Sequence, residues 1–217
     1  MTMKRRDFSL ATASLGLISL AGTAHAQGGA PRAGKDFIAL RKSAPVEAPA
    51  GKVEVVEFFS YNCPHCAVFE PSLEAWVKKL PADVVFRRIP VPFVGNDVEA
   101  KQRLYYTLEA MGKVDALQMR VFRAIHSERQ RIVGDEAILA WIGKQSDVDA
   151  KKFADLFKSF SVVGKAKRAT QLVEAYQVAG VPSLGVAGRW YVDGETAGSL
   201  DRALQITDFL VGEARKG

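Results

Sequence analysis

Residues 53–66 read VEVVEFFSYNCPHC and end in the only two cysteines of this 217-residue chain, Cys63 and Cys66. The run 53–59 is apolar enough to form a central strand buried on both faces, and a helical pattern follows it. The motif therefore places two thiols, two residues apart, where a strand ends and a helix begins. A helix N-terminus stabilises a thiolate, and the spacing lets the second thiol reach the first, so the motif predicts redox exchange through a disulfide.

The four residues of this motif have distinct expected roles. Cys63, at the helix N-terminus on the exposed loop side, is the predicted nucleophile, and Cys66, one turn into the helix, is the more shielded resolving thiol. Pro64 lacks a backbone N–H and stiffens the first helical turn at little cost. A protonated His65 would lower the pKa of Cys63, whereas a neutral His65 would only shape the loop.

Other uses of the cysteine pair fit the sequence less well. A tetrahedral zinc site needs about four ligands, and beyond residue 26 only His65 and His126 are available as histidine ligands. A c-type haem motif requires histidine directly after the second cysteine, where this chain has Ala67. A structural disulfide gains little entropy from closing so short a loop. Redox activity is the preferred interpretation, with a structural or metal-binding pair as the alternatives.

The first 26 residues match a secretory signal peptide. A basic head at 4–6 precedes an apolar stretch at 10–22 that is too short to span a bilayer comfortably, and Ala24-His25-Ala26 fits the small-x-small cleavage pattern. Residues 5–10, RRDFSL, also resemble a twin-arginine export signal. An uncleaved N-terminal anchor is the alternative. We expect export to the periplasm, where an oxidising environment lets a disulfide persist.

Length and charge set broad limits. Residues 27–217 suffice for one domain, or for one domain with a large insertion. The leader holds three cations and one acid, so the net charge of +6 falls to +4 after cleavage. The basic runs at 78–79 and 165–168 lie in helical patterns among acids, which favours a solvated surface over a nucleic-acid site. We therefore expect no nucleic-acid partner.

Hydrophobic periodicity predicts an α/β protein with one sheet and a helical block inserted between its strands. We expect Asp135 and Asp147 to lie at helix N-termini, Ser199 to cap the last helix, and Pro71 to bend the first one. The expected strands are 36–40, 52–60, 84–90, 183–186 and 189–192, and the expected helices are 63–80, 97–111, 114–128, 135–145, 147–160, 162–176 and 200–214.

The run 58–66 (FFSYNCPHC), the helical block and Gly180-Val181-Pro182 together resemble the DsbA family of periplasmic thiol:disulfide oxidoreductases, within the thioredoxin superfamily. The resemblance covers about residues 36–214. The sequence Cys-Pro-His-Cys is fairly specific to this family, because related reductases typically carry Cys-Gly-Pro-Cys and eukaryotic isomerases carry Cys-Gly-His-Cys.

The resemblance implies a thioredoxin fold with an inserted all-helical domain. The thioredoxin-like domain would then comprise residues 27–95 and 177–217, with the insertion at 96–176. The family donates disulfides to newly exported, folding proteins and is reoxidised by a DsbB-like membrane oxidase. The expected protein is a monomer that needs no cofactor besides the Cys63–Cys66 disulfide.

The resemblance also assigns residues around the motif. Pro182 is expected to be cis and to lie against the disulfide, although trans would be expected from the sequence alone. The backbone of Val181 would then pair with an extended substrate. Glu57 is the lone carboxylate in the run 55–59 of a strand expected to be buried on both faces, so its pKa should rise. It matches an acid beneath the disulfide that we expect to handle the Cys66 proton, unless it points to solvent at a strand end.

Three aromatic residues, Tyr61, Phe59 and Phe93, are candidates for an apolar rim that accepts unfolded chains, with Tyr61 as a substrate-binding residue. Such residues are more often part of the core, which is the alternative.

Two rival functions stay open. One is a reductase or isomerase of the same fold. Known isomerases of this kind carry an extra N-terminal dimerisation region, for which the roughly 25 residues before Lys52 leave no room. The other is a copper chaperone or peptide-holding protein whose thiols act as ligands, which would bind metal stoichiometrically and leave protein thiols unchanged.

Overall fold

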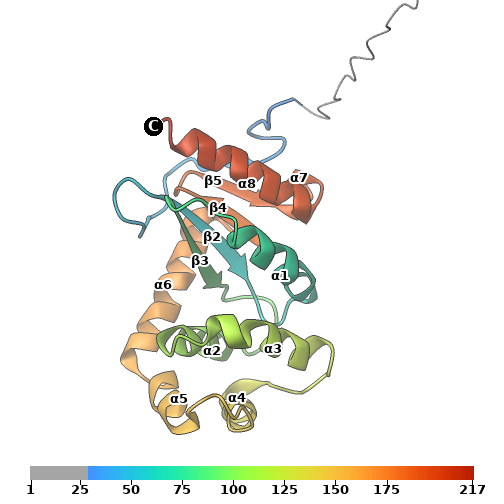
Figure 1. Cartoon of the computed structure of the whole chain (residues 1–217), viewed down its shortest axis with the longest axis vertical. Coiled ribbons are helices and arrows are strands. Elements are labelled where there is room, and N and C mark those ends of the chain that lie inside the picture. Colours follow the sequence, from blue (N-terminus) through green and yellow to red (C-terminus); the bar gives the residue numbers. More distant parts are fainter. Residues whose placement is uncertain (1–28) are drawn as a thin grey trace, which may run out of the picture. The chain divides into compact units, whose positions relative to one another are not determined.

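A five-stranded mixed sheet forms the centre of the fold (Figure 1), with the strand order β1-β5-β4-β2-β3. Strand β2 pairs in parallel with β3, and the remaining pairs are antiparallel. All seven residues of β2 are buried, as the sequence predicts for a central strand. The strands are β1 (Ile38–Ala39), β2 (Val53–Phe59), β3 (Val84–Pro90), β4 (Ser183–Val186) and β5 (Trp190–Asp193).

The structure is a computed structural model that describes residues 29–217, so the expected leader at 1–26 lies outside the described residues. Residues 31–217 form one unit. None of the described helices is both long and apolar enough to cross a membrane.

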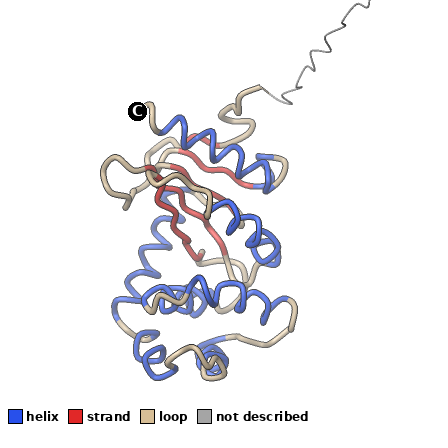
Figure 2. Tube along the Cα trace, in the orientation of Figure 1, coloured by secondary structure: helices blue, strands red, loops and turns tan. Residues whose placement is uncertain are grey.

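Helices α2 to α6 lie between β3 and β4 in the chain, which confirms the predicted helical insertion. Figure 2, in the orientation of Figure 1, shows helices gathered below the strands, where Figure 1 labels α2 to α5. The limits 96–176 for a separate domain stay a prediction. The helices are α1 (Pro64–Val77), α2 (Val98–Ala110), α3 (Val114–His126), α4 (Gly134–Ile142), α5 (Ala150–Phe157), α6 (Phe160–Tyr176), α7 (Gly194–Ala197) and α8 (Leu200–Ala214).

Two apolar clusters cover the sheet. Val55 of β2 belongs to the cluster formed with α1 and α8, whereas Val56 belongs to the cluster formed with the inserted helices. This alternation follows from the two-residue period of a strand. The end of α6 is anchored at Gly185, where a Cβ atom would lie 2.4 Å from the Tyr176 ring and 2.8 Å from Val56. This close approach requires glycine at position 185, and the contact fixes the end of α6 to the sheet.

The structure corrects one cap and adds one helix. Asp147 caps no helix, because its carboxylate pairs with Arg120 of α3 at 2.8 Å. Asp149 instead accepts from the N–H of Lys152 and caps α5. Asp135 lies in the first turn of α4, and Ser199 caps α8 as expected. The short α7 was not predicted, and α1 continues through Pro71, where a bend remains a prediction.

Candidate active site

The sequence places Cys63 as the N-cap residue of α1, with Pro64 in its first turn. Both cysteines are free thiols in this structure. The pKa of Cys63 is lowered to about 6, chiefly by a hydrogen bond from the Cys66 thiol. Burial opposes this shift, whereas the N–H groups of Cys66 and His65 and the charge of His65 favour the thiolate. The Cys63 side chain does not accept the side-chain hydrogen bond that typically caps a helix N-terminus.

Cys66 experiences the opposite effect one turn further along the helix. Burial raises the pKa of the Cys66 thiol, and so do the hydrogen bond that it donates to Cys63 and the negative charge of Glu57. This difference supports the predicted roles of nucleophile and resolving thiol. The expectation that Cys63 is exposed is wrong, because its relative exposure is 5%. Its packing under the adjacent loop leaves only a small opening for an attacking sulfur.

That loop contains the cis peptide bond between Val181 and Pro182, as the resemblance implies. The Cys63 thiol donates to the Val181 carbonyl oxygen at 3.4 Å, a contact available only to the protonated sulfur. His65, Val181 and Pro182 line a hollow of about 500 Å³ together with residues of the β5–α8 segment. The half-buried Val181 thus lies at the edge of this hollow, in contact with Cys63.

Glu57 is fully buried, as expected, but it is not a lone carboxylate. Glu57 faces Arg88 in the register of β2 and β3, and its Oε2 lies 3.2 Å from Arg88 Nε. The guanidinium also pairs with Glu70 at 2.6 Å and Glu74 at 2.5 Å, both on α1. These four residues form the buried charged cluster.

The charges in this cluster do not balance, because three carboxyl groups share one guanidinium. Burial, followed by the neighbouring Glu70, raises the pKa of Glu57 well above its usual range, and Arg88 offsets this only in part. Neither Glu57 oxygen makes a hydrogen bond of good geometry, despite the short distance to Arg88. A carboxyl group in this state can hold a proton that an exposed one would lose.

The predicted apolar rim is wrong for two of its three members. Tyr61 is 1% exposed and Phe59 is fully buried, and their rings pack edge-to-face at 5.1 Å. The Tyr61 hydroxyl donates to Gln118 Oε1 at 2.6 Å, and Gln118 Nε2 donates to Glu70 at 3.4 Å. Tyr61 therefore joins the insertion to the buried charged cluster instead of meeting substrate. Phe93 is partly buried against the core.

The residue before Cys63 is held by a separate loop. The amide of Asn62 donates to the Val94 carbonyl at 3.1 Å and to Asp97 at 3.0 Å. Gly95 has a φ of +101°, and a Cβ there would lie 2.4 Å from the Asn62 amide nitrogen. Only glycine fits both the conformation and the contact. The loop thus fixes the approach of the chain to Cys63.

Sequence reasoning missed Asn62, Glu70, Arg88 and Gln118. Arg88 gives a signal, since it is a charge inside an apolar strand, but its partner depends on the β2–β3 register. Glu70 lies two helical turns after Cys63, so it could have been placed on the same face. Nothing local marks Gln118, which reaches the site through tertiary packing.

The described residues 29–217 contain no group of three or more His, Cys, Asp or Glu side chains that could hold a metal ion. His126 instead lies 2.9 Å from the Tyr61 carbonyl through Nε2, and so it supports the loop before Cys63.

Comparison with known proteins agrees with this site. Residues 54–205 match the family model of the DSBA-like thioredoxin domain. The chain belongs to the DsbA family. It is 39% identical over 206 residues to the thiol:disulfide interchange protein DsbA of Burkholderia cepacia, which covers 95% of this chain and 96% of that protein.

Solved structures of DsbA family members share this fold. The crystal structure of Pseudomonas aeruginosa DsbA superposes with a TM-score of 0.81 at 38% identity, covering 86% of this chain and 95% of that one. The oxidoreductase NmDsbA1 of Neisseria meningitidis gives 0.73 at 28% identity, covering 85% and 94%. The chain is thus a DsbA-like disulfide oxidoreductase that exchanges disulfides through Cys63 and Cys66.

Proposed function

We propose that this protein works as a monomeric disulfide donor for exported proteins folding in the periplasm and that a DsbB-like membrane oxidase restores its disulfide. The observation that best supports this proposal is the contrast between the two thiols. The pKa of Cys63 is lowered to about 6, and the pKa of Cys66 is raised. At pH 7 a thiol with a pKa of about 6 is roughly nine-tenths ionised. The reduced pair is then held as one thiolate and one thiol.

The first exchange starts from the Cys63–Cys66 disulfide. A substrate thiolate attacks Cys63 Sγ, a substrate–Cys63 bond forms, and the bond to Cys66 breaks. The electron pair stays on Cys66 Sγ, which takes up a proton because its raised pKa disfavours the thiolate. Val181 holds the substrate segment through its backbone groups, and Pro182 keeps that segment against the sulfurs.

The second exchange releases the product. Another substrate thiolate attacks the substrate sulfur of the mixed disulfide, and Cys63 leaves as a thiolate. A stabilised thiolate is a good leaving group, so this step is fast. The substrate loses two electrons and two protons. The enzyme keeps both electrons and one proton, on Cys66, and the second proton goes to solvent.

Glu57 is the proposed proton carrier for Cys66. Its raised pKa allows it to be protonated before the exchange. When Glu57 is ionised, its negative charge raises the pKa of Cys66, which favours proton uptake by that sulfur. Transfer of that proton to Cys66 leaves a carboxylate opposite Arg88, which stabilises the charge until a proton returns. His65 is proposed to stabilise the Cys63 thiolate from the solvent side.

Reoxidation needs an acceptor of two electrons, and the chain has no cysteine besides Cys63 and Cys66 that could accept them. A membrane oxidase of the DsbB type would take these electrons. Residues 1–26 would direct export and be removed, with residues 5–6 in RRDFSL supporting the twin-arginine route.

To test this proposal, the purified protein is equilibrated with mixtures of reduced and oxidised glutathione, and the fraction of protein with an oxidised Cys63–Cys66 pair is measured. A disulfide donor gives a reduction potential far above the roughly −270 mV of thioredoxin. A value near or below that of thioredoxin would identify a reductase and overturn the proposal. The double variant Cys63→Ser/Cys66→Ser is the matched control, since it keeps the fold but has no pair to titrate.

A further inference from the structure

The positive charge of this protein is concentrated in residues 151–168, from α5 into α6. This segment has six cations and a single acid, Asp155, for a net charge of +5. Since residues 27–217 carry only +4, the remainder of that chain is slightly acidic. The cations are Lys151, Lys152, Lys158, Lys165, Lys167 and Arg168.

A large apolar side chain projects from the same segment. Phe160, the first residue of α6, is 93% exposed, more than any other large apolar side chain among the described residues. Val163, one turn further along, is 47% exposed. Single exposed apolar residues are common on protein surfaces, but here the most exposed aromatic ring lies within the most basic segment.

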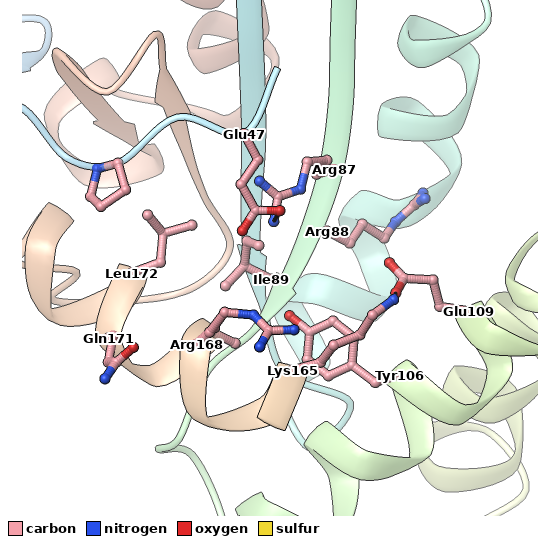
Figure 3. Close-up of a pocket in the computed structure, with 12 residues that line it drawn as sticks. Glu47, Arg87, Arg88, Ile89, Tyr106, Glu109, Lys165, Arg168, Gln171 and Leu172 are labelled. Carbon is pink, nitrogen blue, oxygen red and sulfur yellow. Dashed lines mark hydrogen bonds and ion pairs between the residues drawn. The ribbon is translucent and has the colours of Figure 1, made fainter. Parts of the chain in front are cut away.

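Helix α6 forms a ridge between two hollows that are both edged by cations. One hollow, of about 300 Å³, is lined by Lys165 and Arg168, which project from α6 towards Tyr106 (Figure 3). The other, of about 560 Å³, is lined by Lys158, Val163, Lys167 and residues of α2. Phe160 stands at the N-terminal tip of this ridge.

Four cations of this segment line the two hollows, and three of them have no ion-pair partner within residues 29–217, namely Lys158, Lys167 and Arg168; Lys152, on α5, has none either. Lys165 pairs with Glu109 at 2.5 Å, so it is already neutralised. These three cations together with Phe160 and Val163 are named the α5–α6 corner.

The other charges around the corner do not cancel it. In the smaller hollow, Arg87 pairs with Glu47 at 3.0 Å. In the larger hollow, Arg103 pairs with Asp135 at 2.6 Å, which leaves Glu99 as the acid that faces the corner without a partner. Three free cations against one acid leave a positive surface.

We infer that the α5–α6 corner binds the surface of a lipid bilayer with anionic headgroups. Phosphates would lie beside Lys158, Lys167 and Arg168, and Phe160 would enter the boundary between headgroups and acyl chains. A bilayer offers negative phosphates next to hydrocarbon, which matches cations placed beside Phe160 and Val163. A nucleic acid also offers phosphates, but its apolar surfaces are stacked inside and would leave Val163 uncovered.

This contact goes beyond disulfide exchange and uses neither cysteine. The larger hollow also includes Pro92 and Val98, at the two ends of the loop that holds Asn62 next to Cys63. The corner is thereby linked to the active site through one short loop. Binding there would keep the enzyme at the membrane surface, where the proposed oxidase lies.

Vesicle co-sedimentation tests the inference on the processed protein, because an apolar leader would itself bind lipid. Vesicles containing phosphatidylglycerol should sediment the protein, and phosphatidylcholine vesicles should not. Each cation near an anionic surface contributes roughly fivefold to partitioning, so K158Q/K167Q/R168Q should weaken binding roughly a hundredfold. The matched control K78Q/K79Q/K144Q removes the same charge from exposed positions elsewhere and should bind nearly as well as the parent, while both variants keep full oxidase activity.

Phe160 provides a second, independent readout. Phe160→Ser should weaken binding roughly tenfold, and Phe160→Trp should show a blue-shifted emission only with phosphatidylglycerol vesicles. No sedimentation, equal sedimentation with phosphatidylcholine, or an equal loss in the control triple variant would overturn the inference. Tighter binding to an oligonucleotide than to the anionic vesicles would also overturn it.

Discussion

The first turn of α1 and the buried charged cluster act in opposite directions on two neighbouring sulfurs. At the helix end, a hydrogen bond from the Cys66 thiol lowers the pKa of Cys63, helped by the N–H groups of Cys66 and His65 and by the charge of His65. On the inner side, burial and Glu57 raise the pKa of Cys66. One helical turn therefore separates a sulfur that is stable as a thiolate from one that is stable as a thiol.

This contrast teaches that direction in disulfide exchange comes from the unequal surroundings of two identical groups. A pair with equal pKa values would release either sulfur with similar ease. Here Cys63 is the better leaving group and Cys66 retains its proton. The substitutions below each remove one of the groups that make the two cysteines differ.

The largest effect is expected from the cysteines. Cys63→Ser should lower the rate of disulfide donation by at least about a thousandfold, because no sulfur remains for the substrate to attack. Cys66→Ser should instead accumulate mixed disulfides between Cys63 and substrate, visible on non-reducing gels. Oxidase activity retained by the Cys63 variant would contradict the assignment of the nucleophile.

Arg88→Met should remove the only cation of the buried charged cluster. Leaving buried carboxyl groups unpaired costs about 3–5 kcal/mol in the free energy of unfolding. This loss in the free energy of unfolding should become smaller as the pH falls, because protonated Glu57 and Glu70 are neutral and need no cation beside them. Arg87→Met is the matched control on the same strand. It removes the cation from one buried carboxylate, Glu54, instead of from both Glu57 and Glu70, so its loss should be smaller. Equal losses in urea unfolding would show that the cluster has no special role.

Glu57→Gln should slow the first exchange roughly a hundredfold, which is the lower end of the range for the loss of a positioned proton donor. Removal of the carboxylate should also lower the pKa of Cys66, so its alkylation should begin at lower pH. Glu54→Gln is the control, because Glu54 is equally buried on β2 but pairs with Arg87. An unchanged pH profile of Cys66 alkylation would remove Glu57 from the mechanism.

The smallest effect is expected from His65→Ser. His65 is the last of the resolved influences on Cys63, so the pKa of Cys63 should rise by roughly one unit or less. Thiolate absorbance titration at 240 nm measures this pKa. Pro64→Ala, which leaves His65 in place, is the comparison, and a titration identical to the parent would discard the role of His65.

Much of the fold follows from local sequence. The burial of β2 on both faces, the cap at Ser199 and the helical insertion all reflect short-range patterns. The Cys-Pro-His-Cys motif also gave the position of both thiols at α1, because helix geometry alone fixes them.

The parts that could not be predicted depend on tertiary contacts. The pairing of Glu57 with Arg88 depends on strand register, which the sequence does not determine locally. Tyr61 was expected at the surface, but its ring packs at 5.2 Å on Phe122, which belongs to the distant α3. The exposure of Cys63 was misjudged for the same reason, since the covering loop at Val181 is 118 residues away.

The central claim is that the protein is more stable reduced than oxidised, and urea unfolding of both forms tests it most directly. A lowered pKa of about 6 for Cys63 adds stability to the reduced form above that pH and none below it. The contribution should be on the order of 1 kcal/mol at pH 7 and should grow until about pH 8.5, where an unfolded thiol also ionises. We predict a reduced form that unfolds at higher urea, with a gap that widens from pH 6 to pH 8.5. An oxidised form that is the more stable throughout this range would contradict the account.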